Sequence, residues 1–143
     1  MTAQAKTLLI DGSNAVHAVF GFWPETREQQ NLAAEDFVAA LSDWAGRQPD
    51  WDIEVVFDGG TRPLGTSRMP PGLRVIFSGH ESADSVILER ARALRYYQKR
   101  VTVVTWDREL AQSAREEEAK VLDPQRLWRA VSSGARLGGR DAK

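Results

Sequence analysis

Acidic residues follow the apolar segments of this sequence in a recurring pattern. Asp11 comes directly after the run LLI, Asp58 directly after VVF, and Asp107 two residues after VVT. Glu81 and Asp84 are three residues apart at the start of a helical pattern, which puts them on neighbouring positions of one helix face. If the apolar runs are parallel strands, their carboxyl ends meet at one rim of a sheet, where such folds bind ligands.

Packed carboxylates repel one another, and their pKa values rise unless a cation neutralises them. Oxygen ligands select hard cations such as Mg²⁺ or Mn²⁺, and Mg²⁺ takes few carboxylates and keeps several waters. Such an ion can polarise a phosphodiester and generate hydroxide near neutral pH. We therefore expect a divalent-metal site built from Asp11, Asp58, Glu81, Asp84 and Asp107, with these acids acting directly or through water.

Further polar residues could act on the same substrate. Asn14 is placed to contact a phosphate or to orient Asp11, and Thr105 can point its hydroxyl at the rim. Arg62 and Arg68 lie in the segment GGTRPLGTSRMPPG, which reads as a long loop, and their guanidinium groups could bind phosphates. Trp106 could stack on a base, although a buried or half-exposed structural tryptophan is the commoner case.

Each acid also has a purely structural explanation. Asp11, Asp58 and Asp107 could be turn residues or helix N-caps, because aspartate accepts hydrogen bonds from free N–H groups there. Asp123 precedes Pro124, which is the typical N-cap and N1 pair, and we expect Asp123 to be structural. The recurrence of acids at several strand ends favours a metal site over independent caps.

The second acidic pair and the basic residues have alternatives as well. Ser78 and Glu81 have the spacing of a capping box, and Asp84 could simply complement a helix dipole. A helix face formed by Arg92, Arg95 and Lys99 could follow a phosphate backbone or simply be solvated. The acidic run at 116–118 would repel RNA, so we expect it to face away from the cleft. His80 has no partner at a zinc-binding spacing.

Strand and helix patterns alternate along the chain. Apolar runs predict strands at residues 7–10, 53–57, 73–77, 101–105 and 119–122, and helical patterns begin near residues 13, 34, 82, 108 and 124. This alternation predicts an α/β fold with a roughly five-stranded parallel sheet sandwiched by helices. We expect one domain over residues 1–132 and a disordered tail over 133–143 that touches an anionic partner.

Composition limits the class of protein. An apolar share of 42% with 27% charged residues is typical of an ordered globular domain. The net charge of −1 excludes a binder that attracts nucleic acid by global charge, so any affinity for RNA is local. There is no cysteine, and the N-terminus lacks a run long enough for a signal peptide or membrane span. We expect a cytoplasmic protein with no membrane association.

The motifs LLIDGSN, VVFDGG, ESADSVILE and VVTWD, in this order and spacing, resemble the YacP-like branch of the NYN domain, within the PIN-like nucleases. The resemblance covers residues 7 to about 131. It implies a Mg²⁺- or Mn²⁺-dependent endoribonuclease that cleaves single-stranded RNA with metal-activated water and leaves a 5′-phosphate. It makes Asp11, Asp84 and Asp107 the principal acids, and a ribosome or protein partner that delivers the RNA is compatible with it.

By position, the resemblance assigns supporting roles to Asn14, Asp58, Glu81 and Thr105. The sequence departs from the family pattern at Trp106, where a small polar residue is usual, and in the shorter segment after the fourth strand. Both departures concern substrate contacts.

Two other functions fit parts of the pattern. A receiver-like phosphoacceptor module also uses acids at strand ends, with a threonine and a lysine at the ends of successive strands, but here Lys120 begins its predicted strand. A non-catalytic RNA-binding domain of the same fold would bind RNA whether or not metal is present.

Overall fold

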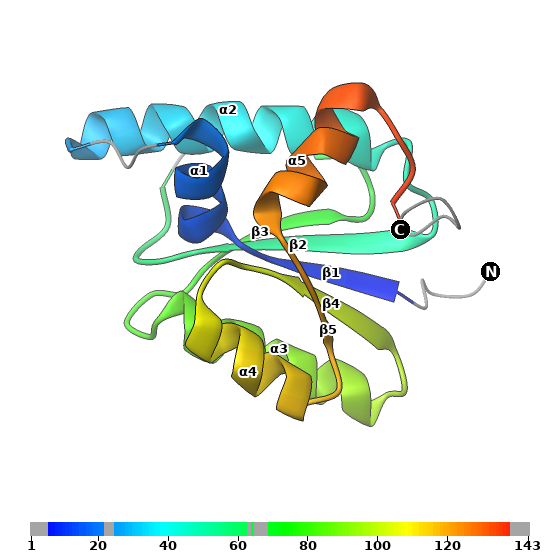
Figure 1. Cartoon of the computed structure of the whole chain (residues 1–143). Coiled ribbons are helices and arrows are strands. Elements are labelled where there is room, and N and C mark those ends of the chain that lie inside the picture. The colour runs from blue at the N-terminus through cyan, green and yellow to red at the C-terminus, as the bar shows by residue number, and fades with distance from the viewer. Residues whose placement is uncertain (1–5, 22–24, 63, 65–68, 138–143) are drawn as a thin grey trace.

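A parallel sheet of five strands, in the order β3-β2-β1-β4-β5, forms the centre of the protein (Figure 1). The computed structural model describes residues 6–21, 25–62, 64 and 69–137. The strands are β1 (Lys6–Asp11), β2 (Trp51–Phe57), β3 (Leu73–Phe77), β4 (Arg100–Val104) and β5 (Lys120–Leu122). The helices are α1 (Gly12–Phe20), α2 (Arg27–Ala45), α3 (Ala83–Tyr96), α4 (Arg108–Glu116) and α5 (Pro124–Ser133). The predicted α/β class is confirmed.

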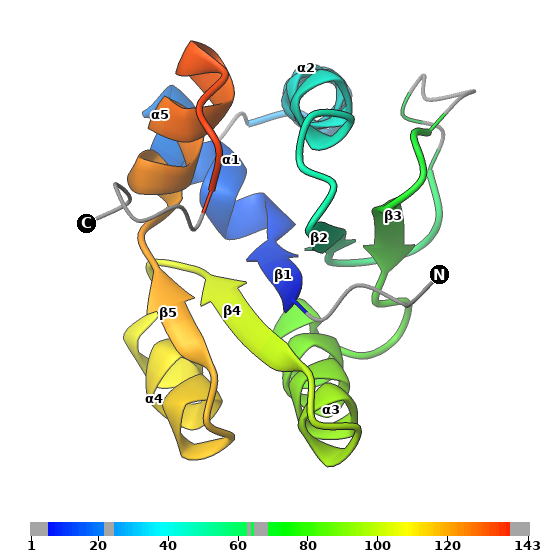
Figure 2. The same cartoon turned by 90° about the vertical axis from the view of Figure 1, so that its right-hand side faces the viewer.

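Helices cover both faces of the sheet. Helices α1, α2 and α5 lie on one face, and α3 and α4 lie on the other (Figures 1 and 2). Alternate residues of β1 supply the two cores: Leu8 and Ile10 pack with Phe37 and Trp44 of α2, whereas Leu9 packs with Ile87 of α3. Because both faces are buried, the central strands read as continuous apolar runs rather than alternating ones.

The parallel register brings the strand ends together. Asp11, the last residue of β1, pairs with Val56, and Asp58 lies two residues after Val56, just beyond the end of β2. Thr105 lies one residue beyond the end of β4, although the sequence predicted it as the last residue of that strand. Asp11, Asp58 and Thr105 therefore lie at the same rim of the sheet.

Gly12 allows the first helix to begin immediately after β1. A Cβ atom at this position would lie 2.6 Å from Cδ1 of Phe57 and 2.9 Å from the carbonyl oxygen of Val56. Contacts that short require atoms of β2 to move. The glycine of the LLIDGSN motif is thus needed for the close approach of α1 to the neighbouring strand.

The chain remains ordered beyond the domain boundary that we expected at residue 132. Trp44 Nε1 donates to the carbonyl oxygen of Ala135 at 2.9 Å, and Trp51 Nε1 donates to that of Leu137 at 3.1 Å. The Leu137 N–H donates to Gln48 Oε1 at 3.1 Å. The expectation of disorder is therefore corrected for residues 133–137, because buried indole and amide groups bind this backbone. Residues 138–143 lie outside the described residues.

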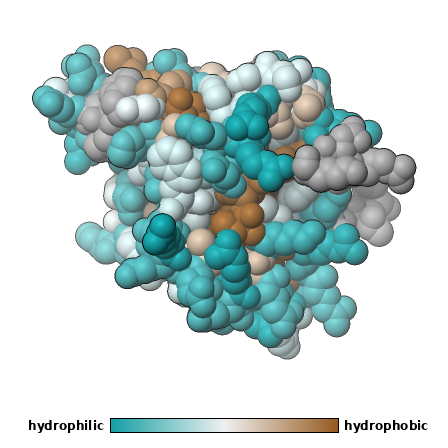
Figure 3. Space-filling view, in the orientation of Figure 1, coloured by the Kyte–Doolittle hydropathy of each residue, from teal (hydrophilic) through white to brown (hydrophobic). Residues whose placement is uncertain are grey.

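The face seen in the orientation of Figure 1 is mostly polar. Hydrophilic residues cover most of it, and hydrophobic residues show near the middle and at the upper left of the view (Figure 3). No helix in the described parts of the chain is long and apolar enough to cross a membrane.

Candidate functional site

Asp11 is the most deeply buried acid of the predicted site. It is only 5% exposed, and it occupies the N-cap position of α1 without a side-chain capping hydrogen bond. Instead, the Thr105 hydroxyl donates to Asp11 Oδ2 at 3.0 Å. Asp11 therefore stands at the N-cap position of α1 while its side chain accepts a hydrogen bond from a distant hydroxyl.

The electrostatics of Asp11 favour its neutral form. Its pKa is raised from 3.8 to about 7, mainly by burial; the Thr105 hydrogen bond opposes this rise, and the nearby carboxylates of Asp84 and Asp58 add to it. The N–H of Asn14 also favours the charged form, although it lies outside capping geometry. A buried aspartate with like charges beside it is the situation that a bound cation relieves.

Asp84 is coupled to the same group of acids. Its pKa is raised by partial burial first, and then by the carboxylates of Asp107, Asp58 and Glu109. Asp11, Asp58, Asp84 and Asp107 therefore share one electrostatic environment, although they come from four different places in the sequence.

Asp58 and Asp107 also accept backbone hydrogen bonds that stabilise the fold. Asp58 Oδ1 accepts the N–H of Ala83 at 2.8 Å, which ties the end of β2 to the first turn of α3. Asp107 Oδ1 accepts the N–H groups of Glu109 and Leu110 at 2.9 and 3.0 Å and caps α4. The predicted N-cap role is therefore correct for Asp107, whereas Asp58 binds the first turn of a helix that Ser82 caps. In each carboxylate these hydrogen bonds use one oxygen.

Asn14 and Thr105 link α1 to the segment after β4. Asn14 Oδ1 accepts the N–H of Trp106 at 2.7 Å and lies 3.5 Å from the Thr105 hydroxyl. Thr105 Oγ1 in turn accepts the N–H of Asp107 at 3.0 Å. The two polar residues thus fix the positions of both Asp11 and Asp107.

Glu81 stands apart from the other acids. Its side chain is exposed, and its N–H donates to the carbonyl oxygen of Ser78 at 3.2 Å. The alternative of a capping box is not what the structure has: Ser82 is the N-cap of α3 and accepts the N–H of Ser85, whereas Ser78 Oγ accepts the N–H of Gly59.

One of the two loop arginines can be described. Arg62 donates from a terminal guanidinium nitrogen to the carbonyl oxygen of Asp58 at 3.1 Å, and its guanidinium carbon lies 5.2 Å from the centre of the Phe77 ring. Burial, followed by the charge of Arg27, lowers its pKa, while Asp58 opposes this. Arg62 is therefore held beside the acidic rim, and Arg68 lies outside the described residues.

The basic face of α3 is neutralised by acids. Arg92 donates to Glu117 at 3.0 and 3.1 Å, and Arg95 pairs with Glu118 at 2.9 Å and with Glu117 at 3.4 Å. This corrects the idea that the face follows a phosphate backbone. The acids lie just before β5, at the end of the sheet opposite Asp11, as expected for a run that faces away. Lys120, the first residue of β5, is at that opposite end too, which removes the receiver-like reading.

The acids do not form a ready-made cage. Within the described part of the chain, no three His, Cys, Asp or Glu side chains are close enough together to hold a metal ion. Hydrogen bonds from the first turns of α3 and α4 hold Asp58 and Asp107 in place. The sequence predicted that all five acids converge. In the structure the charges of Asp11, Asp58, Asp84 and Asp107 affect one another, but no three of these side chains surround one point.

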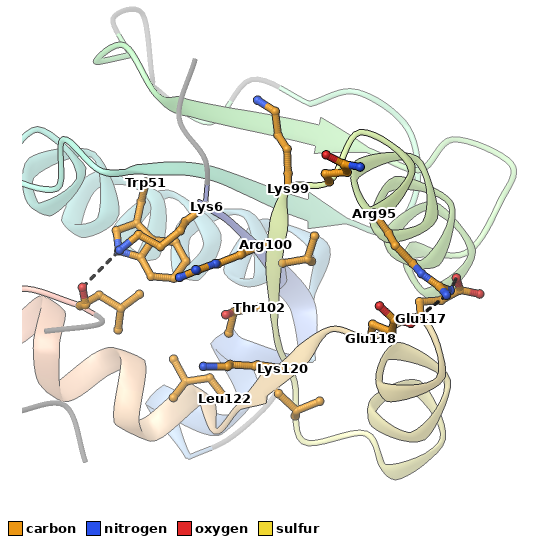
Figure 4. A pocket seen from close by; sticks show the side chains of 14 residues that line it. Lys6, Trp51, Arg95, Lys99, Arg100, Thr102, Glu117, Glu118, Lys120 and Leu122 are labelled. Atoms are coloured by element: carbon orange, nitrogen blue, oxygen red, sulfur yellow. Dashed lines mark hydrogen bonds and ion pairs between the residues drawn. The ribbon is translucent and has the colours of Figure 1, made fainter. Parts of the chain in front are cut away.

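Two pockets lie at opposite ends of the sheet. The larger, about 790 Å³, is at the amino ends of the strands, where Lys6 lies 5.0 Å above the Trp51 ring (Figure 4). The smaller, about 600 Å³, lies next to the acids and includes Thr105 and Trp106 in its wall. It also contains residues that sequence reasoning did not single out, namely Arg108, Gln112, Arg115 and Arg126. The signal for them in the sequence was their place in the two helices, α4 and α5, that begin after Asp107 and Asp123.

Comparisons with known proteins agree with this architecture. Two crystal structures of Rae1 (YacP) from Bacillus subtilis, one of a mutant form, superpose with a TM-score of 0.72 each. The sequence identities are 22% and 23%, and the alignments cover 90% and 89% of this chain and 76% and 74% of the other. At this identity the likeness establishes the fold.

No curated protein sequence matches the chain. The sequence model of the YacP-like NYN domain matches residues 8–137, nearly the whole chain. The chain therefore belongs to the YacP-like NYN domain family, and NYN domains are PIN-like nucleases.

Proposed function

We propose that this protein is a divalent-metal-dependent endoribonuclease that cleaves single-stranded RNA. The observation that supports this most is Asp11, which is 5% exposed, has Asp84 and Asp58 as like-charged neighbours, and accepts its hydrogen bond from a neutral hydroxyl. A protein that only needed stability would gain from replacing such a group. A bound cation would offset the repulsion between Asp11 and its neighbouring carboxylates.

The residues present fit a hydrated hard cation. The donors are carboxylate oxygens, which suit Mg²⁺ or Mn²⁺, and one oxygen of both Asp58 and Asp107 is not used in helix capping. Mg²⁺ is commonly held by one or two carboxylates and several waters, so a cage of three acids is not required. The spacing of the acids therefore favours a site in which some carboxylates act through water.

In this proposal Asp11, Asp84 and Asp107 hold the hydrated metal, some of them through its waters, and Asp58 and Glu81 assist directly or through water. When bound, the ion supplies a nucleophilic hydroxide near neutral pH and stabilises charge on the leaving oxygen. Water would attack the phosphodiester in line, and the product would carry a 5′-phosphate.

The remaining residues of the chain position these groups. The Thr105 hydroxyl keeps Asp11 oriented and accepts from the backbone of Asp107, so it sets the relative placement of two acids. Asn14 fixes the Trp106 backbone and is close enough to the rim to bind phosphate or water. Arg62, and Arg68 in the same loop, would neutralise the phosphates of the substrate.

The test is cleavage of an end-labelled single-stranded RNA in Mn²⁺ by the wild type and by Asp84→Asn. We expect at least about a 100-fold loss for the variant, because a metal-holding carboxylate is removed. Asp36→Asn, on the exposed side of α2, is the matched control and should cleave at the wild-type rate. Equal cleavage by wild type and Asp84→Asn would reject the proposal and point to a contaminating nuclease.

A second candidate is a non-catalytic RNA-binding domain of the same fold. The absence of three converging acids among the described residues favours it. It predicts that wild-type protein binds single-stranded RNA equally with EDTA and with Mn²⁺, and that no cleavage accompanies binding. The cleavage assay above separates the two candidates directly.

A further inference from the structure

The smaller cleft begins at the acidic rim and extends away from it. Its wall includes Thr105, whose hydroxyl binds Asp11 at 3.0 Å, and it continues between α4 and α5 past the end of β5. The volume of about 600 Å³ is large enough for a nucleotide. A nucleic-acid strand that extends from the acids on this side would enter the cleft at Trp106 and Arg108, the two chain neighbours of Asp107.

Trp106 presents an exposed but oriented ring at the mouth of this cleft. The side chain is 48% exposed, yet its indole N–H donates to Asp123 Oδ1 at 3.1 Å and its backbone N–H donates to Asn14. A large aromatic ring that is held in place while facing solvent loses little conformational freedom when a base stacks on it. The Asp123 carboxylate therefore acts as N-cap of α5 and as the anchor of this ring.

The cleft is basic. Arg108 and Arg115 of α4 and Arg126 of α5 contribute to its wall, and Asp123 is the one acid among the described residues that do so. Arg108 and Arg115 form no ion pair with any described residue, in contrast to Arg92 and Arg95 of α3. Guanidinium groups without carboxylate partners are suited to phosphates.

We infer that this cleft binds single-stranded RNA, with one base stacked on Trp106 and the neighbouring phosphates bound by Arg108, Arg115 and Arg126. The inference rests on the proposed function in that the bound strand is the nuclease substrate. It extends that function by naming where the strand lies outside the acidic rim. Stacking is tolerant of base identity, so binding here is expected to be independent of sequence.

Binding is measured by fluorescence anisotropy, with a labelled single-stranded RNA of about 12 nucleotides in EDTA. Trp106→Ala should weaken binding about tenfold, whereas Trp106→Phe, which keeps a ring, should stay within about threefold of the wild type. Tyr96→Ala is the matched control, because Tyr96 is an exposed aromatic residue of α3 outside the cleft. Equal affinities of Trp106→Ala and Tyr96→Ala would overturn the inference.

The arginines are tested by salt dependence. Arg126→Ala should bind more weakly and should lower the slope of log K against log salt by about 0.7 per lost phosphate contact. Arg129→Ala removes the same charge from α5 outside the cleft and should leave the slope unchanged. Identical slopes for these two variants would also overturn the inference.

The two proposals fail separately. If Asp84→Asn cleaves like the wild type while Trp106→Ala loses RNA affinity, the binding site stands and the nuclease mechanism falls. If Asp84→Asn is inactive while Trp106→Ala binds RNA like Tyr96→Ala, the mechanism stands and the cleft does not bind the strand.

Discussion

The two ends of the sheet differ in whether their carboxylates have basic partners. At the carboxyl ends, Asp11 and Asp84 sit among other carboxylates, and their pKa values are raised by burial and by those neighbours. At the amino ends, acids meet bases: Arg95 pairs with Glu117 and Glu118. The same chain therefore leaves one end electrostatically unfavourable and neutralises the other.

Glu54 of β2 is a buried acid that differs from Asp11 in having a positively charged partner. Glu54 is 4% exposed, nearly as buried as Asp11, but it accepts two hydrogen bonds from Arg90 at 2.9 and 2.6 Å. Burial alone does not mark a functional acid. The difference is whether a positive partner is supplied by the chain or has to be supplied from outside.

The sharpest way to break this comparison is Asp11→Asn. Because the folded-state pKa is raised from 3.8 to about 7, the stability that Asp11 contributes is fully present below about pH 4 and is lost as the pH rises through 7. In EDTA at pH 8 the variant should be more stable than the wild type by up to about 4 kcal/mol, and nearly equal to it at pH 4. Urea unfolding at both pH values measures this. Parallel pH profiles for the two proteins would contradict it.

Metal should reverse that instability in the wild type. Mn²⁺ at about 100 times its dissociation constant should raise the free energy of unfolding by about 2.7 kcal/mol, because it binds only the folded protein. Asp11→Asn should gain much less, and Asp36→Asn should respond like the wild type. Equal stabilisation of all three proteins would place the ion away from the acidic rim.

Glu54→Gln should have a smaller effect on stability and none on chemistry. The substitution leaves the Arg90 guanidinium, 33% exposed, without its carboxylate, so we expect a loss of about 2 kcal/mol in urea unfolding. RNA cleavage under conditions where the variant is folded should stay at the wild-type rate. A folded variant with impaired cleavage would mean that Glu54, although paired with Arg90, also contributes to the chemistry at the acidic rim.

The smallest change is expected from Glu117→Gln. The Arg92 and Arg95 side chains lower the Glu117 pKa, so its contribution is present above the ordinary value of 4.5 and is lost as the pH falls. The pair faces solvent, which screens it, and the urea midpoint at pH 7 should barely move. A large shift would show that the amino end of the sheet depends on its ion pairs more than its exposure suggests.

Much of the fold could be read from the chain. Continuous apolar runs mark strands buried on both faces, and the predicted segment 73–77 coincides with β3. Pro124 after Asp123 marks the start of α5 as expected, with Asp123 accepting the N–H of Gln125 at 2.7 Å. The ordered segment after α5 could not be read, because hydrogen bonds from distant residues rather than its own apolar content hold it.

The candidate site was predictable only in part. Asp107 looks the same in sequence whether it caps α4, holds a metal or does both, because aspartate is suited to each. Arg92 and Arg95 looked available for RNA until their partners, more than twenty residues away, were visible. Periodicity identifies a face but not what that face meets.

The sequence by itself determined that acids would stand at the ends of parallel strands, because local patterns set strand ends and parallel strands share a direction. Only the tertiary structure decided which acids find a positive partner. Glu54 meets Arg90, whereas Asp11 meets a hydroxyl and other carboxylates. Charge compensation depends on distances between side chains that are far apart in the chain, and local sequence patterns do not contain those distances.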